Sequence, residues 1–348
     1  MQRPNWLPSY LPELDGLRGI AILAVVLYHC NPRLQGTWLY YASLWGWAGV
    51  ILFFVLSGFL ITCILLGTRD KPHYLHNFHG RRALRVWPVY LLVLVVVYLN
   101  ADWFIGGSVW HAIKTAPWLA YLFCVQNLFH LALPPALSPT WALAIEEQYY
   151  FLWAPMVRVL RRPWMLAAVL VAALVASPTL RHANLHWMTP TNTLIHLDGI
   201  ALGSLIALAF YTLKLSRRAW LAIGGVAFVL GIAAAATIAG GTSLLDSALA
   251  VGFAGAMLAA IASTGARNPL SAALRRGPLA FYGRISYGLY MTHISVFIYF
   301  GWFDARMNSH GIAGNLAVVA FRLLMTTVVA TVLWYGFESQ ILKLKRYF

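Results

Sequence analysis

Ten apolar segments, each about 17 to 25 residues long, constrain the fold of this chain more than any other feature of its sequence. A helix of that length crosses the hydrocarbon core of a bilayer. Hydrophobic residues make up 61% of the chain and charged residues only 10%, a balance typical of integral membrane proteins. The sequence therefore predicts an all-α integral membrane protein with about ten transmembrane helices, at residues 14–30, 47–66, 86–104, 140–157, 164–180, 194–212, 219–239, 244–264, 281–300 and 316–337.

The stretch 117–137 is also apolar, but three prolines interrupt it, so we expect a re-entrant or interfacial segment there. The basic residues support this assignment. With ten spans and both termini in the cytoplasm, 19 of the 25 Lys and Arg residues fall on the cytoplasmic side and four on the other, in agreement with the positive-inside rule. The net charge of +15 thus reflects orientation in the membrane, and we expect no binding of nucleic acid.

The spans and their short loops occupy the whole chain, so the sequence predicts a single transmembrane domain over residues 1–348, located in the inner (cytoplasmic) membrane of the cell. The first apolar segment lacks the small-residue cleavage site of a signal peptide. Cys30, Cys63 and Cys124 each lie in apolar sequence, and we expect them to pack in the core or face lipid rather than to form disulfides or bind a metal.

The segment LDGLRGIAILAVVLYH carries polar side chains that a hydrocarbon span normally excludes. Arg18 and His29 are about three helical turns apart, so both lie on one helix face, about 16 Å from each other along the axis. Asp15 precedes Arg18 by three residues, so a local ion pair is the alternative to a functional role. For His29 the alternative is a hydrogen bond to a neighbouring helix.

Arg82 and Arg85 lie at positions i and i+3 of NFHGRRALRVWPVY, residues 77–90. They either anchor the cytoplasmic end of the third span or bind phosphate, because guanidinium groups match phosphate oxygens and remain charged. Three histidines precede the pair, but no fourth ligand is evident, and we predict no metal site.

Two adjacent carboxylates, Glu146 and Glu147, occur in SPTWALAIEEQYYFLWAP, residues 138–155. On a helix they point about 100° apart, so at most one of them faces a narrow site. Tyr150 lies one turn after Glu146 and offers it a hydroxyl group. The alternative is that a carboxylate neutralises a buried arginine.

The segment RISYGLYMTHISVF, residues 284–297, places a histidine in the middle of a span. Ser286, Tyr290 and His293 lie close to one helix face. They either contribute to a site or make hydrogen bonds between packed helices.

Together these segments resemble the acyltransferase family 3 membrane proteins, from Leu14 to Glu338. Ala142 and Tyr149 stand where the family usually has Ser and Phe. The resemblance is carried by seven motifs in order: LDGLRGIAILAVVLYH (14–29), GVILFFVLSGFLI (49–61), RRALRVWPVY (81–90), WALAIEEQYYFLWAP (141–155), LDGIALGSLIAL (197–208), ISYGLYMTH (285–293) and YGFE (335–338).

The resemblance implies transfer of an acyl group, usually acetyl, from cytosolic acyl-coenzyme A to a hydroxyl group of a carbohydrate or lipid-linked glycan. Arg18, Arg82 and Arg85 would hold the phosphates of the donor. His29 would act as general base or as a transient acyl carrier, with Glu146 as its partner in catalysis. The positions expected to contact substrate or support the site are Asp15, Trp141, Glu147, Tyr150, Tyr290 and His293. No tightly bound cofactor is predicted.

Many members of this family carry an additional extracytoplasmic esterase-like domain. The 348 residues leave no room for one beside ten spans, so we expect a stand-alone form that completes the transfer itself. Two other function classes compete with the enzyme. In a transporter, the intramembrane Arg, Glu and His groups would form a substrate or proton pathway. A glycan-binding scaffold would neither transport nor catalyse.

Overall fold

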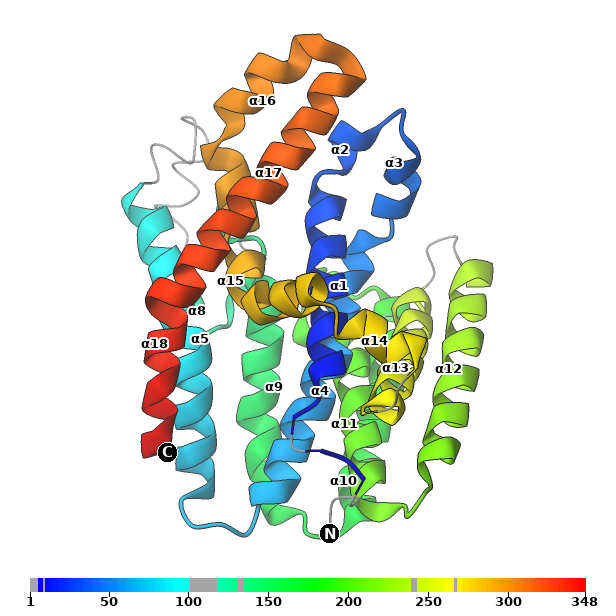
Figure 1. Cartoon of the computed structure of the whole chain (residues 1–348). Helices are drawn as coiled ribbons and strands as arrows, with labels where there is room; N and C mark the ends of the chain where they lie inside the picture. Colours follow the sequence, from blue (N-terminus) through cyan, green and yellow to red (C-terminus); the bar gives the residue numbers. More distant parts are fainter. Residues whose placement is uncertain (1–5, 9, 101–117, 131–133, 239–242, 266–267) are drawn as a thin grey trace.

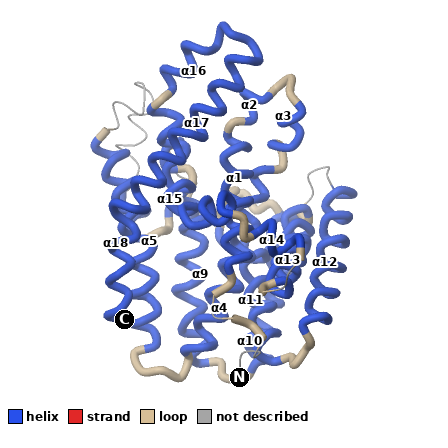
Figure 2. Tube along the Cα trace, in the orientation of Figure 1, coloured by secondary structure: helices blue, strands red, loops and turns tan. Residues whose placement is uncertain are grey.

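The structure, a computed structural model of the whole chain, describes residues 6–8, 10–100, 118–130, 134–238, 243–265 and 268–348. Within these ranges every regular element is helical and none is a strand, which confirms the predicted all-α class (Figure 2). Seven helical stretches in this part of the chain are long and apolar enough to cross a membrane: Trp38–Thr68, Tyr74–Leu99, Pro163–Ala183, Thr193–Thr212, Arg217–Ile238, Leu245–Ser263 and Gly311–Tyr347.

Three further long helices that carry charged motifs are not among these seven. They are α1 (Pro12–His29), α9 (Thr140–Val159) and α15 (Gly277–Tyr299), with 18, 20 and 23 residues. All three coincide with predicted spans. The total of ten spans and the cytoplasmic location of both termini stay predictions.

The helix α5 (Tyr74–Leu99) differs from its predicted span, 86–104. It begins a full three turns earlier, because Arg, Ala and Leu in this stretch favour helix and Pro88 is accommodated inside it. Residues 101–104 lie outside the described residues. As a result Arg82 and Arg85 belong to the long helix itself and not to a loop.

The apolar stretch 117–137 contains only short elements where it is described, and Pro117 lies outside that part. They are α8 (Trp118–Leu122), η2 (Gln126–Leu128) and η3 (Pro135–Leu137). None is long enough to cross a bilayer. The remaining long helices are α4 (Gly49–Thr68), α10 (Pro163–Ala183), α11 (Leu197–Thr212), α12 (Arg217–Ile238), α13 (Leu245–Ser263) and α17 (Gly311–Leu333).

Figure 1 shows α12 at one edge of the bundle and α5 with α18 (Ser339–Leu342) at the opposite edge. The helix α16 (Gly301–Met307) and the first part of α17 extend beyond one end of the other helices. The helices α1, α4, α9 and α11 lie between the two edges. The chemistry-bearing helices α1 and α9 therefore lie in the interior of this view and not at either edge.

Glycines bring α1 and α15 into backbone contact. A Cβ atom on Gly283 would lie 1.9 Å from the carbonyl oxygen of Asp15, and one on Gly19 would lie 2.2 Å from that of Leu279. Small residues allow this close approach between membrane helices. The contact places the side chains of α15 beside those of α1.

We expect Gly283→Ala to destabilise the protein by at least ~1–3 kcal/mol, because the added methyl group would overlap the backbone of α1. The matched control is Gly225→Ala in α12, where a Cβ would meet nothing within 4 Å. That change should be neutral or slightly stabilising, since Ala favours helix over Gly by about 1 kcal/mol. Thermal unfolding of both variants in detergent, followed by size-exclusion chromatography, measures the difference. Equal melting temperatures would contradict the close-packing argument.

Candidate active site

The helix α1 is continuous from Pro12 to His29, so Arg18 and His29 are held on one rigid element. Arg18 lines two adjoining cavities, and His29 lines a third. The α1 face that was predicted to be polar therefore borders a series of cavities.

The first of these, which we call the cationic cavity, has a volume of about 390 Å³. The helices α1, α4 and α9, the first half of α5 and the last turn of the chain, η7 (Lys343–Tyr347), meet around it. Among the residues that the structure describes, no carboxylate lines it. Its five basic side chains are Arg18, Arg81, Arg82, Arg85 and Lys345.

Two further cavities continue the series. The central cavity, about 70 Å³, shares the side chains of Arg18, Ser57, Arg82 and Arg85 with the cationic cavity. The histidine cavity, about 250 Å³, is lined by His29, His196 and His293. It shares Val50, Phe54 and Tyr290 with the central cavity. The three cavities thus adjoin one another from the arginines to the histidines.

Arg82 makes two ion pairs with α9. Its Nη2 lies 2.9 Å from Oε2 of Glu146, and its Nε lies 3.0 Å from Oε1 of Glu147. Its guanidinium also lies over the ring of Tyr150, 4.4 Å from the centroid. The carboxylates of both adjacent glutamates, Glu146 and Glu147, therefore compensate the charge of Arg82.

Glu146 is held by three donors. Besides Arg82, the hydroxyl of Ser57 donates to its Oε1 at 2.6 Å and that of Tyr150 to its Oε2 at 3.1 Å. Within the described residues Glu146 makes no contact with His29. Of the two alternatives for Glu146, the pairing with an arginine is the one present in the structure.

Arg18 and Arg85 differ from Arg82, because neither forms an ion pair within the described residues. Arg85 lies within electrostatic range of Arg18, Arg82 and Glu338. Glu338 ends a π-helical turn, η6 (Trp334–Glu338), and its Oε1 is buried with no hydrogen-bond partner in the described part of the chain. The cationic cavity thus holds two arginines that make no ion pair within the described residues, although Glu338 lies within electrostatic range of both, and their guanidinium groups can bind an anion.

Asp15 does not pair with Arg18. Its carboxylate accepts a hydrogen bond from the hydroxyl of Tyr10, which precedes α1. This hydrogen bond to a carboxylate raises the pKa of Tyr10. The local ion pair that the spacing allowed is therefore not formed.

His29 and His293 lie side by side, with ring centroids 4.8 Å apart. The Nδ1 of His29 lies 2.8 Å from the carbonyl oxygen of Val25, and because that oxygen only accepts, this Nδ1 carries a proton. By the same reasoning the Nδ1 of His293 carries a proton, because it lies 2.7 Å from the carbonyl oxygen of Tyr290. The Nε2 of His293 is then an acceptor 3.3 Å from Nδ1 of His29.

This tautomer leaves the Nε2 of His29 with a free lone pair in the neutral ring. Within the described residues that atom has no hydrogen-bond partner, and His29 is half-buried in the lining of the histidine cavity. A group with this arrangement can take a proton from a hydroxyl or attack a carbonyl carbon. Tyr290 lines both this cavity and the central one, so it stands at their junction.

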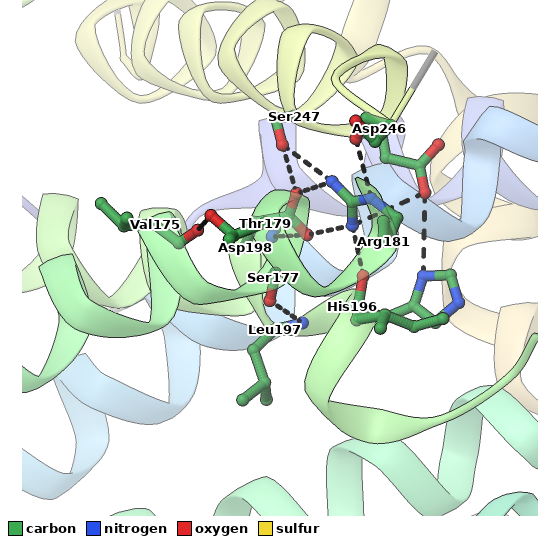
Figure 3. A network of polar contacts seen from close by, with 12 residues as sticks. Val175, Ser177, Thr179, Arg181, His196, Leu197, Asp198, Asp246 and Ser247 are labelled. Atoms are coloured by element: carbon green, nitrogen blue, oxygen red, sulfur yellow. Dashed lines mark hydrogen bonds and ion pairs between the residues drawn. The ribbon is translucent and has the colours of Figure 1, made fainter. Parts of the chain in front are cut away.

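A second polar network was not predicted as a unit (Figure 3). Arg181, in the last turn of α10, donates to Oδ2 of Asp198 at 2.6 Å and to the hydroxyl of Ser247 at 2.8 Å. Ser247 in turn donates to Asp198 at 2.6 Å. Arg181 is one of the four basic residues that the ten-span prediction places on the side opposite the cytoplasm. The signal in the sequence was the position of Asp198 and Asp246 in the first turns of two apolar segments, where the helix dipole favours a carboxylate.

Asp246 extends this network to the histidine cavity. Its Oδ2 lies 3.8 Å from Nη1 of Arg181 and 3.8 Å from Nδ1 of His196. Asp246, His196 and Trp141 all line the histidine cavity, and the rings of Trp141 and His196 are 5.2 Å apart. Of these three residues, the sequence analysis predicted Trp141 as a site residue but missed His196 and Asp246.

Within the described residues no group of three or more His, Cys, Asp or Glu side chains is arranged to hold a metal ion. The histidines before Arg82 do not converge: the ring of His76 lies 5.2 Å from that of Phe348, and the ring of His79 lies 6.2 Å from that of Phe151.

The sequence matches a protein family whose model is described as an acyltransferase domain, over residues 11–335. No solved structure matches the chain.

Two relatives are named O-acetyltransferases. The O-acetyltransferase OatA of Staphylococcus aureus strain NCTC 8325 is 25% identical over 376 aligned residues, which cover 97% of this chain and 58% of that protein. The peptidoglycan O-acetyltransferase OatA of Listeria monocytogenes is 35% identical over 155 residues, covering 42% of this chain and 24% of that protein. The chain thus spans little more than half the length of the curated relative that it matches along almost its whole length.

Proposed function

The chain belongs to acyltransferase family 3 and is an acyltransferase, and from this premise we propose that it moves an acetyl group from cytosolic acetyl-coenzyme A to a hydroxyl group of a carbohydrate. The observation that supports this most directly is the series of cavities joining five basic side chains to the His29–His293 pair. An enzyme that binds its donor on one side of a membrane and transfers the acyl group to an acceptor on the other side needs a continuous series of cavities between the two.

Coenzyme A is polyanionic, and the cationic cavity offers it charge-assisted hydrogen bonds. Arg82 already holds Glu146 and Glu147, so we assign phosphate binding chiefly to Arg18 and Arg85. This refines the earlier expectation, in which all three arginines shared that role.

The pantetheine arm would extend from the cationic cavity through the central cavity toward His29. The two ends of this path, Arg18 and His29, are separated by roughly 16 Å along α1. The hydroxyl of Ser286 is buried in the lining of the central cavity with no hydrogen-bond partner in the described residues. It is available to an amide group of the arm.

In direct transfer, the Nε2 of His29 takes the proton of the acceptor hydroxyl, and the oxygen attacks the thioester carbonyl carbon. The carbon–sulfur bond then breaks, and the leaving thiolate takes the proton back from His29. In the alternative, Nε2 attacks the thioester carbonyl carbon, the carbon–sulfur bond breaks, and coenzyme A leaves as the thiolate. The acceptor oxygen then attacks the acetyl-imidazolium, its proton passes to the thiolate, and the carbon–nitrogen bond breaks to restore the neutral ring. The hydrogen bond from Nδ1 to Val25 orients the ring for both routes.

For this chemistry the cationic cavity must open toward the cytoplasm. We assign ten spans with both termini on that side, which agrees with the excess of basic residues in the loops there. The inner (cytoplasmic) membrane is the location in which a cytosolic donor and an extracytoplasmic glycan are both accessible. The name of one relative makes peptidoglycan the first acceptor to test.

The protein purified in lipid nanodiscs should bind radiolabelled acetyl-coenzyme A and transfer the label to de-O-acetylated peptidoglycan fragments. Combined Arg18→Ala and Arg85→Ala substitutions should weaken donor binding at least tenfold, since each removed guanidinium contributes about 1.5–3 kcal/mol to a charged hydrogen bond. Arg306→Ala, outside the cavities, is the matched control. Solute flux through reconstituted vesicles without consumption of acetyl-coenzyme A would instead support the transporter.

A further inference from the structure

Three side chains of the histidine cavity are not explained by the His29–His293 pair. They are Trp141 from α9, His196 from η4 (Thr193–His196) and Asp246 from α13. These elements are remote from α1 in the sequence, yet their side chains border the same 250 Å³ space as His29. A ligand beside His29 would therefore contact them.

The linings of the cationic cavity and the histidine cavity differ in charge. In the described part of the chain, the cationic cavity is lined by five basic side chains and no carboxylate. The described lining of the histidine cavity includes Asp246 and three histidines, and contains no lysine or arginine. A phosphorylated or carboxylated group is favoured in the first cavity and repelled in the second. The occupant of the histidine cavity should therefore be uncharged where it meets Asp246.

Asp246 and His196 both present unused acceptors. Within the described residues Asp246 accepts no hydrogen bond, and its two ion contacts at 3.8 Å involve Oδ2 alone. Asp198, by contrast, is saturated by Arg181, Ser247 and the backbone N–H of Gly199. The Nε2 of His196 lies 2.9 Å from the carbonyl oxygen of Pro190 and must donate to it.

The Nδ1 of the neutral His196 ring is then an acceptor, and it lies next to Oδ2 of Asp246 (Figure 3). Within the described residues no hydrogen-bond donor bridges these two neighbouring acceptors, and Arg181 stays 3.8 Å from Oδ2, so the pair suits a ligand that brings several hydroxyl protons. Trp141 completes this surface, because the electron-rich face of an indole ring favours the positively polarised C–H groups of a sugar ring.

We propose that Trp141, His196 and Asp246 form the acceptor subsite and hold an uncharged, hydroxyl-rich sugar unit with one hydroxyl directed at His29. This inference rests on the proposed function and adds the place and the chemistry of its acceptor. Asp246 and His196 position the sugar, and Arg181 fixes Asp246 from behind the cavity lining.

The test compares wild type with Asp246→Asn, using radiolabelled acetyl-coenzyme A and soluble, de-O-acetylated peptidoglycan fragments as probes. We expect the KM for the fragments to rise about tenfold or more, because a hydrogen bond to a charged group is weakened. The KM for acetyl-coenzyme A should stay within a factor of two. Asp70→Asn, at an exposed carboxylate outside these cavities, is the matched control and should leave both constants unchanged.

Asp246→Asn should fold, because Arg181 keeps its contacts with Asp198, Ser243 and Ser247. Trp141→Leu provides an independent test with the same expected split between the two KM values. If wild type acetylates the fragments and neither variant raises the acceptor KM, the acceptor subsite is wrong and the proposed function stands. If wild type binds acetyl-coenzyme A but acetylates none of the fragments, the proposed function fails and the subsite fails with it.

Discussion

Replacing His29 by alanine is expected to lower kcat for acetyl transfer by about 10²–10⁴, the usual contribution of a positioned general acid–base. The reason is specific to one atom. The Nδ1 of His29 is engaged by Val25 and His293, so within the described residues Nε2 is the atom of this ring that keeps a free lone pair at the histidine cavity. Binding of acetyl-coenzyme A should be unchanged, since the donor phosphates are assigned to the distant cationic cavity.

His182→Ala is the matched control, because His182 is exposed at the end of α10 and lines none of the three cavities. Donor binding is measured by equilibrium dialysis in nanodiscs and transfer by release of free thiol. A normal kcat in the His29→Ala protein would exclude His29 as base and as acyl carrier. Trapping of labelled acetyl on the wild-type protein, absent from His29→Ala, would distinguish the acyl carrier from the base.

Replacing Arg82 by alanine is expected to destabilise the protein by about 3–5 kcal/mol, which is the typical cost of removing one partner of a buried ion pair. Arg82 compensates two carboxylates at once, and the side chains of Arg82, Glu146 and Glu147 are only 15%, 15% and 17% exposed. Its loss would leave two adjacent negative charges in the interior of a membrane protein.

The neighbouring Arg85 provides a matched comparison within the same motif. It lies one turn later on α5 and lines the same cavities, but it makes no ion pair in the described residues. Arg85→Ala should therefore keep the melting temperature and weaken donor binding, while Arg82→Ala should lower the melting temperature. Adding Glu146→Gln and Glu147→Gln to Arg82→Ala should restore much of the stability. Equal melting temperatures for the two single variants would show that the ion pairs of Arg82 do not support the fold.

Much of the fold follows from local features of the sequence. The apolar segments were located because length and hydropathy are properties of a short stretch of chain. The placement of Arg18 and His29 along one polar face was predictable because the helical repeat alone fixes it. The boundary of α5 was misplaced because hydropathy marks where lipid-facing residues begin, whereas the helix continues into polar sequence.

The sequence by itself thus determined the helical class, the positions of the apolar segments and the residue types available for chemistry. Only the tertiary structure decided how those residues are paired. Glu146 lies with Arg82 and Ser57 rather than with His29, and His29 meets His293 from the far end of the chain. The same holds for Asp246 beside His196. Such contacts depend on which helices pack together. Complementary shape sets that packing, as where Gly283 approaches the backbone of Asp15. The periodicity of a single segment does not encode this complementarity.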